Sequence, residues 1–175
     1  EGLEIPDENR LLGVGDGLKV TQIRLGTARL THCMRWLGLS KRCLEEASAY
    51  VAHRMSFGQT LAAHEGVQWM LGDVAKDIQI GRLLTMQAAW KLDQGDFTRS
   101  DISIAKIHAA DTLHKAADTA IQLLGARGYS KDTIVEWIYR YARQARLVDG
   151  ASEIHKMVLS RAYLSEGQDF FRWGV

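Results

Sequence analysis

The sequence predicts an all-α protein, an antiparallel up-and-down bundle of four to five helices preceded by a short non-helical segment. Three observations support this class. Apolar or small residues recur every three or four positions over long stretches. Polar segments that contain glycine separate these stretches, and no stretch alternates apolar and polar residues as a half-buried strand does. The length of 175 residues suits one domain with a substantial core.

The N-terminal residues 1–19 differ from the remainder of the chain. They hold the only proline, Pro6, and a turn-rich segment at 13–17, without helical periodicity. We therefore expect residues 1–19 to be the tail of a preceding domain and residues 20–175 to form the helical domain. A start so unlike the remainder also predicts that the chain is part of a longer protein.

The first helix is predicted from about Thr21 to near Arg54. Its expected inward stripe is Leu30, Met34, Leu37, Lys41, Leu44, Ser48 and Val51. Gly26 and Gly38 lie inside this helix, where each costs about 1 kcal/mol relative to alanine. Either close packing or ligand approach explains them, or they are merely tolerated.

A break at 56–60 precedes the second helix, which ends at 94–96. Ser100 or Asp101 is expected to cap an alanine-rich third helix, which stops at Gly125. Its alanines predict closely packed neighbours.

A loop at 127–131 separates the third helix from a shorter fourth helix over 134–142, with Ser130 or Asp132 as the expected cap. The last helix is predicted to begin after Gly150. Its expected inward stripe is Ile154, Met157, Val158 and Ala162, and residues 167–175 are expected to fray.

Composition limits the classes of partner. Twenty-two basic and 21 acidic residues leave a formal charge of +1, so no overall field favours nucleic acid or a membrane surface. No apolar run approaches the ~20 residues that span a bilayer, and the N-terminus lacks the pattern of a signal peptide. Cys33 and Cys43 form no CxxC pair, which predicts buried, inert thiols in a reducing compartment. We therefore expect a soluble protein without a nucleic-acid or membrane partner.

Several kinds of site are not encoded. A di-iron bundle needs Glu-x-x-His on two helices, and only residues 111–114 have a related spacing, so no metal site is expected. The six histidines are scattered and are expected at the surface or at an interface. Neither a Gly-x-Ser-x-Gly nucleophile nor a Gly-x-Gly-x-x-Gly dinucleotide loop is present. Any nucleotide must be held in another way.

Asp149 is the first candidate for chemistry. Gly150 lets the chain bend, and Ser152 and Glu153 belong to the first turn of the last helix, so the carboxylate is expected near a helix N-terminus. There it is either a helix cap or a general base that faces a cleft.

Two further segments are suited to binding a ligand. Arg54 to Gly58 combines a guanidinium, a hydroxyl, an aromatic ring and a turn glycine, which could hold a phosphate and a planar group. Residues 122–128 combine an amide side chain with small residues that let backbone approach a ligand. The alternatives are a helix-ending turn and a glycine C-cap.

Three segments together resemble one family: Arg54-x-Ser56-Phe57-Gly58, then Gln122-x-x-Gly125-x-x-Gly128-Tyr129, then residues 149–154. In this order and spacing, residues 18–166 resemble the C-terminal helical domain of the acyl-CoA dehydrogenases. Residues 5–13 look like the closing segment of that family's middle β-domain. Residues 24–35 resemble the branch that contains human family members ten and eleven.

The resemblance implies an FAD-dependent oxidoreductase that α,β-dehydrogenates an acyl-CoA thioester. Asp149 would remove the α-proton while the β-hydrogen leaves as hydride to the flavin, and the electrons would pass to an electron-transfer flavoprotein. The implied FAD contacts are Arg54, Ser56, Phe57, Ala151 and Glu153, with Gln122, Gly125 and Ala126 holding the FAD of a neighbouring subunit. Arg29 and Gly150 would contact the substrate.

A homodimer or homotetramer is also implied, in the cytoplasm of a bacterium or the mitochondrion of a eukaryote. This chain alone is expected to be inactive, because the family encloses flavin and substrate with two further domains. The alternatives are an acyl-CoA oxidase, which uses O₂ as acceptor, and a non-catalytic helical assembly domain of the same fold.

The sequence departs from the family pattern near both sites. Asp149 stands where a glutamate is usual, which shortens the reach of the base by about 1.5 Å. Ala126 replaces a common glycine, Ala151 a threonine and Glu153 a glutamine. Some members carry the base on the first long helix, but that position is Ala28 here, which leaves Asp149 as the candidate.

Overall fold

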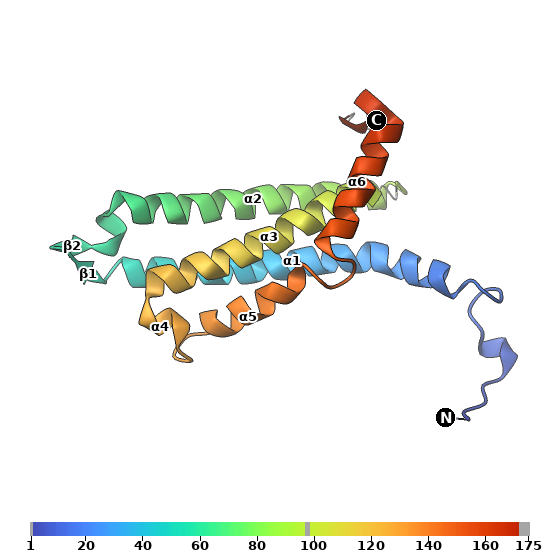
Figure 1. The fold of residues 1–175 in the computed structure, drawn as a ribbon, viewed down its shortest axis with the longest axis horizontal. Helices are drawn as coiled ribbons and strands as arrows, with labels where there is room; N and C mark the ends of the chain where they lie inside the picture. The colour runs from blue at the N-terminus through green and yellow to red at the C-terminus, as the bar shows by residue number, and fades with distance from the viewer. Residues whose placement is uncertain (1, 97–98, 172–175) are drawn as a thin grey trace.

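The computed structural model describes residues 2–96 and 99–171. Three long helices run antiparallel and form the body of the bundle: α1 (Gly17–Val51), α2 (Glu65–Asp93) and α3 (Arg99–Leu124). The shorter α5 (Val135–Ala145) packs on α1 and α3, whereas α6 (Ser152–Glu166) packs on α3 and then leaves the bundle steeply (Figure 1). The predicted all-α antiparallel bundle is confirmed.

Smaller elements connect these helices. The two-residue strands β1 (Met55–Ser56) and β2 (Gln59–Thr60) pair antiparallel, and α4 (Ala126–Tyr129) forms one turn where a loop was expected. The described residues therefore contain six α-helices rather than four or five. Short 3₁₀ helices cover Asp7–Asn9, Leu61–Ala63 and Gly167–Phe171.

The break after α1 is a tight hairpin. Phe57 (φ 51°) and Gly58 (φ 81°) both have positive φ, as in the type I′ turns that suit two-residue hairpin loops. Val51 ends α1 three residues before the expected end, so Arg54 lies in the turn that leads into β1. The hairpin presents residues 54–58 at one end of the bundle (Figure 1).

The alanine-rich face of α3 forms the centre of the core. Ala105, Ala109, Ala110 and Ala117 are each fully buried, beside α1, α2, α5 and α6. Small side chains allow these helices to approach closely, which is the packing that the alanines predicted.

The inward face of α1 differs from the expected stripe. Met34, Lys41 and Ser48 are exposed, whereas Cys33, Trp36, Ser40, Cys43 and Ala47 are buried together with Leu30, Leu37 and Val51. Ser40 can be buried because its hydroxyl donates to the Trp36 carbonyl at 2.8 Å.

The stripe predicted for α6 is wrong at two of its four residues. Ile154 and Met157 are 51% and 41% exposed, whereas Val158 and Ala162 are half-buried. The fully buried side chains of this helix are Ser152 and His155. His155 can be buried because it contacts the Ser103 hydroxyl and the Asp149 carbonyl, whereas the Ser152 hydroxyl has no hydrogen-bond partner among the described residues.

Several predicted helix ends also differ. α1 begins at Gly17 rather than near Thr21. Ser100 and Asp101 lie inside α3, where Asp101 accepts a hydrogen bond from Lys91 at 2.8 Å, so neither is its N-cap.

Neither Ser130 nor Asp132 caps α5, since Ile134 is its N-cap residue; the Ser130 hydroxyl instead accepts from the Asp132 amide at 3.2 Å. Residues 167–171 form a 3₁₀ helix instead of fraying, and residues 172–175 lie outside the described residues.

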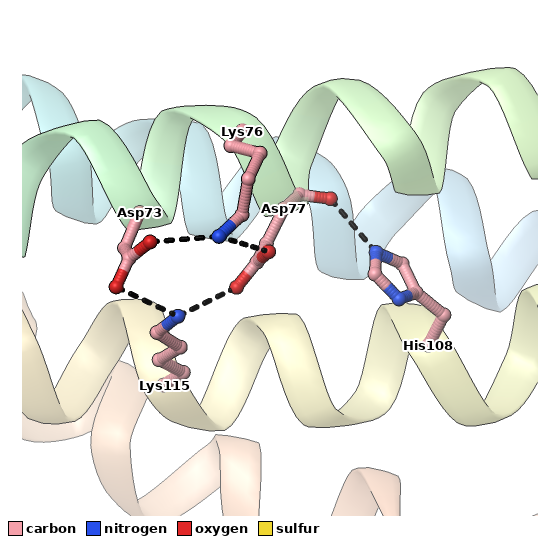
Figure 2. A network of polar contacts seen from close by, with 5 residues as sticks. All are labelled: Asp73, Lys76, Asp77, His108 and Lys115. Carbon is pink, nitrogen blue, oxygen red and sulfur yellow. Dashed lines mark hydrogen bonds and ion pairs between the residues drawn. The ribbon is translucent and has the colours of Figure 1, made fainter.

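An ion-pair network joins α2 to α3 (Figure 2). Lys115 of α3 lies 2.8 Å from a carboxylate oxygen of Asp77 and 3.8 Å from one of Asp73. Lys76 bridges the same two carboxylates on α2, and His108 donates from Nε2 to the Asp77 carbonyl at 2.9 Å. The network fixes the register of the two helices along one side of the bundle.

Candidate active site

The connection between α5 and α6 has an unusual backbone. Asp149 (φ 52°) and Gly150 (φ 97°) both lie at positive φ, which is costly for a residue with a side chain. Such strain persists only where the surroundings impose it, and it is common at functional sites. Gly150 also leaves little room for a side chain, because an added Cβ would lie 3.1 Å from His155 Nε2.

Three side chains from three helices hold this turn by its carbonyl groups. Arg29 of α1 donates from Nε to the Asp149 carbonyl at 2.9 Å, and Lys106 of α3 donates from Nζ to the Gly150 carbonyl at 2.8 Å. His155 of α6 lies with Nε2 3.3 Å from the Asp149 carbonyl. The turn is therefore fixed from every helix around it, which explains the strained conformation.

The hydrogen-bond partners of His155 determine its tautomer. A carbonyl can only accept, so Nε2 carries the hydrogen and Nδ1 accepts from the Ser103 hydroxyl at 2.9 Å. Burial, as the largest cause, lowers the pKa of His155, and the neighbouring charges of Lys106 and Arg29 lower it further. His155 is therefore neutral near pH 7.

Lys106 and Arg29 place positive charge beside the turn. Burial lowers the pKa of both, and the Asp149 carboxylate opposes this effect in both. Lys106 is fully buried and lies over the Trp36 ring, with Nζ 5.8 Å from the ring centroid.

The Asp149 carboxylate points at α1. Its Oδ2 lies 2.6 Å from His32 Nε2, and the two side chains are 21% and 23% exposed. The contact is at ion-pair distance but is not aligned, so among the described residues Oδ2 has no partner that meets hydrogen-bond geometry. Ala151, not Asp149, is the N-cap residue of α6, so the helix-cap interpretation of Asp149 is wrong.

The predicted site residues fall into two groups. The first contains Asp149, Gly150 and Arg29, which are in contact, followed along the chain by Ala151 at the start of α6 and the exposed Glu153 in its first turn. This group lies beside the N-terminal half of α1 (Figure 1).

The second group lies at the hairpin end of the bundle. Arg54, together with Tyr50, His53, Leu124 and Arg127, lines an open hollow of about 410 Å³. Phe57 at the hairpin tip is 96% exposed, and Ser56 precedes it. Gln122, Gly125 and Ala126 are exposed at the junction of α3 and α4, the same end of the bundle (Figure 1).

The two groups are far apart. His32 and Val51 are 19 residues apart on one helix, which corresponds to about 28 Å at a rise of 1.5 Å per residue. Arg54 lies beyond Val51. The residues predicted as FAD contacts therefore do not form one site within this chain.

Sequence reasoning missed four residues around Asp149: His32, Ser103, Lys106 and His155. The expectation that each of the six histidines lies at the surface or at an interface is wrong for His155, which is 4% exposed and buried against α3 within this chain. Lys106 offered a signal, because it is the one cation within the alanine-rich inward face of the third helix. A buried lysine requires acceptors, and here it finds the Gly150 carbonyl.

Residues 2–96 and 99–171 hold neither a cluster of metal-binding side chains nor a membrane-spanning helix. They contain no group of three or more His, Cys, Asp and Glu side chains that could hold a metal ion. No helix in the same ranges is long and apolar enough to cross a membrane.

Comparisons with known proteins indicate one family. The family profile described as "Acyl-CoA dehydrogenase, C-terminal domain" matches residues 15–164. The chain is 36% identical over 169 residues to "Probable acyl-CoA dehydrogenase IBR3" of Arabidopsis thaliana and 34% identical over 166 residues to "Acyl-CoA dehydrogenase family member 11" of Rattus norvegicus. These alignments cover 93% and 94% of this chain but 20% and 21% of the relatives.

A solved structure agrees with these relatives. The chain superposes on a glutaryl-coenzyme A dehydrogenase in complex with glutaryl-CoA with a TM-score of 0.88 and 31% identity, over 98% of this chain and 43% of that one. The chain thus spans about a fifth of the two relatives and less than half of the solved dehydrogenase. It belongs to the acyl-CoA dehydrogenase family and corresponds to the family's C-terminal helical domain.

Proposed function

We propose that this chain supplies the catalytic base of an FAD-dependent acyl-CoA dehydrogenase, and that Asp149 is that base. Asp149 removes the α-proton of an acyl-CoA thioester while the β-hydrogen leaves as hydride to FAD, which serves as the two-electron acceptor. The products are the α,β-unsaturated thioester, a protonated Asp149 and the reduced cofactor.

The observation that carries this proposal is the restrained turn at Asp149. Arg29, Lys106 and His155 hold its two carbonyl groups, so the carboxylate is presented from a fixed backbone. A base on a fixed backbone needs little reorganisation before proton transfer.

The charges around the turn suit the same step. Proton removal moves negative charge from the carboxylate to the thioester, and the positive charges of Arg29 and Lys106 lie beside the turn that carries this carboxylate. Preorganised charges of this kind stabilise a transition state in which charge develops.

The hairpin end of the bundle fits one part of FAD. Arg54 and Arg127 line the hollow there, and neither guanidinium makes an ion pair with another described residue. Two such guanidiniums suit a diphosphate, and the exposed Phe57 ring and Gln122 amide suit a planar base. Gly125 has a φ of 62° and exposed backbone, so it can approach such a ligand closely.

The distance between the two groups supports a proposal in which they contact different cofactor molecules. We infer that Asp149, Ala151 and Glu153 lie beside the flavin of their own subunit. Arg54, Ser56, Phe57, Gln122, Gly125 and Ala126 contact the FAD of a neighbouring subunit. The active enzyme is then a homodimer or homotetramer.

Acyl-CoA thioesters are the proposed substrate class. The solved relative is in complex with glutaryl-CoA, and Arg29 and Gly150 lie next to Asp149. An electron-transfer flavoprotein is the proposed acceptor. The compartment follows the source, cytoplasm in a bacterium and mitochondrion in a eukaryote.

The test uses the full-length protein with butyryl-, octanoyl- and palmitoyl-CoA and a dye acceptor. Asp149→Asn should lower kcat by about 10²- to 10⁴-fold, the usual contribution of a general base. The control Asp118→Asn changes an exposed aspartate on α3 and should behave as wild type. Near wild-type turnover by Asp149→Asn would show that another group is the base.

Two outcomes would favour the alternatives. Turnover with O₂ that releases peroxide stoichiometrically would indicate an oxidase. Purification without bound flavin, with no bleaching by any acyl-CoA after FAD is added, would indicate a non-catalytic assembly domain.

A further inference from the structure

We propose that His32 is a positioning residue for the base: its Nε2–H holds Oδ2 of Asp149, and Arg35 holds the far side of the imidazole. This inference rests on the proposed function, because it assigns a role relative to Asp149 as base. The family resemblance assigned no role to His32 or Arg35.

The His32 ring is held on three sides. It stacks on Trp36 with ring centroids 5.4 Å apart and planes inclined by 20°. Arg35 Nη2 contacts Nδ1, and Asp149 Oδ2 lies 2.6 Å from Nε2. Trp36 is fully buried, so it is a rigid platform for the ring.

The tautomer of His32 follows from its contact with Arg35. A guanidinium has donors and no acceptor, so Nδ1 of His32 must accept from Arg35. In the neutral imidazole the hydrogen then resides on Nε2, the atom that faces the Asp149 carboxylate. Arg35 itself is placed by Tyr141 of α5, over whose ring its guanidinium carbon lies 5.7 Å from the centroid.

The contacts of the Asp149 carboxylate leave a place for this donor. Oδ2 is buried and has no aligned hydrogen-bond partner among the described residues, while His32 Nε2 is at contact distance. Hydrogen bonds at catalytic sites are often poorly aligned before substrate binds and tighten afterwards. With Oδ2 held by His32, the other carboxylate oxygen is free to receive the α-proton.

This arrangement also bears on the shorter base. An aspartate reaches less far than the usual glutamate and has fewer rotatable bonds to correct its aim. A fixed donor on α1 sets which carboxylate oxygen faces the substrate. The chain Tyr141–Arg35–His32–Asp149 thus links α5 and α1 to the turn before α6.

The charged and titratable groups that face Asp149 are Arg29 and His32 from α1, Lys106 from α3 and His155 from α6. Arg99 near Arg29 and Asp111 near Lys106 lie further out. Of the facing groups, His32 is the one at contact distance from the carboxylate, so its removal should affect the protonation of the base most directly.

The test compares variants of the full-length protein with the same acyl-CoA panel. His32→Phe keeps a ring on Trp36 and removes the donor, and should lower kcat by about 10- to 100-fold with a smaller change in KM. His32→Gln retains an N–H donor and should restore most of kcat.

The matched control is His114→Phe. His114 is also a partly exposed histidine in ring contact with an aromatic residue, Tyr139, at 5.5 Å, but it has no recorded contact with Asp149. It should show wild-type kcat and KM. Arg35→Met should fall between wild type and His32→Phe, because it frees the ring without removing it.

Two outcomes distinguish failure of the positioning role from failure of the base assignment. If Asp149→Asn is inactive while His32→Phe keeps wild-type kcat and KM, the positioning role is wrong and the base assignment stands. If Asp149→Asn retains turnover, both fail.

A readout independent of activity is the ring ¹⁵N signal of His32, identified by its loss in His32→Phe. The proposal requires hydrogen on Nε2 at neutral pH and a ring ¹⁵N signal that moves in Asp149→Asn. An unchanged signal in Asp149→Asn would overturn it.

Discussion

Asp149 shows how one residue combines strain and chemistry. A left-handed non-glycine residue costs roughly 1–3 kcal/mol, and Arg29, Lys106 and His155 oppose this cost by binding the carbonyls of the turn. A helix cap would need no such restraint. The strain and its three supports are therefore better explained by the placement of a carboxylate than by the start of α6.

Restoring the family's usual glutamate tests the fit of the pocket to aspartate. Asp149→Glu lengthens the side chain by about 1.5 Å, which should misplace the carboxylate relative to His32 and lower kcat by roughly 10-fold or more. The acyl-CoA panel measures this, with Asp118→Glu as the control. Unchanged kcat with every acyl-CoA would mean that the site accepts a base with either side-chain length.

The two cysteines make stability depend on alkaline pH. Burial raises the pKa of Cys33 and of Cys43 from 9.0 to about 12. Between these values the folded protein keeps protons that the unfolded chain has lost, so stability should fall as pH rises above 9. Three units correspond to an upper limit of roughly 4 kcal/mol per thiol.

Urea unfolding at pH 7.5 and 10 measures this loss, and Cys33→Ala or Cys43→Ala should each remove part of it. Both thiols should also resist a thiol reagent at pH 8 until urea is added. Rapid labelling of the folded protein would contradict their burial.

At the scale of elements, the glycines inside helices occur there for different structural reasons. An added Cβ at Gly81 of α2 would lie 2.6 Å from Leu37 Cδ2 and 3.1 Å from His108 Cδ2, whereas at Gly38 it would meet nothing within 4 Å. Gly81 is therefore required where α1, α2 and α3 meet. Close packing within this chain does not explain Gly26 or Gly38, because an added Cβ at either position would meet nothing within 4 Å.

These two glycines predict opposite effects on stability. Gly38→Ala should stabilise by about 1 kcal/mol through helix propensity. Gly81→Ala should destabilise the folded protein, because overpacking costs roughly 1–3 kcal/mol. Most of that range exceeds the stability gained from the higher helix propensity of alanine. Urea unfolding measures both, and a Gly81→Ala variant as stable as Gly38→Ala would mean that Leu37 and His108 can move aside.

The α2–α3 ion pairs should contribute unequally (Figure 2). Asp77 is 18% exposed and close to Lys115, whereas Asp73 is 55% exposed and closest to Lys76 on its own helix. Asp77→Asn should therefore lower Tm more than Asp73→Asn, and 1 M salt should reduce the difference. Equal effects of the two substitutions would indicate that the link between helices adds no stability.

At the scale of the whole molecule, periodicity was enough to predict the class and the long helices, because their apolar spacing repeats over many turns. It failed where a hydrogen bond allows a polar side chain to be buried. Ser40 donates to a carbonyl of its own helix, and His155 contacts the Ser103 hydroxyl and the Asp149 carbonyl. Lys106 and His32 join the site from distant positions in the chain. Their contacts depend on helix register, which no local pattern encodes.

The separation of the two groups of site residues predicts complementation between subunits. We take each active site to use Asp149 of one subunit and the Arg54 end of its neighbour. Homo-oligomers of Asp149→Asn, or of Arg54→Ala with Gln122→Ala, should then be impaired at every site. A mixed dimer of the two variants has one impaired site and one with both wild-type groups, so it should recover about half of the wild-type activity.

Co-expression with two different affinity tags, followed by sequential purification, isolates the mixed species from full-length protein. Turnover and bound FAD per dimer are then compared with both parents and with a wild-type pair that carries the same tags. If Asp149 and Arg54 served the same cofactor from one subunit, the mixed dimer would have Asp149→Asn at one site and the Arg54 variant at the other. It would then be no more active than its parents, and the assignment of the hairpin end to a neighbour's FAD would have to be withdrawn.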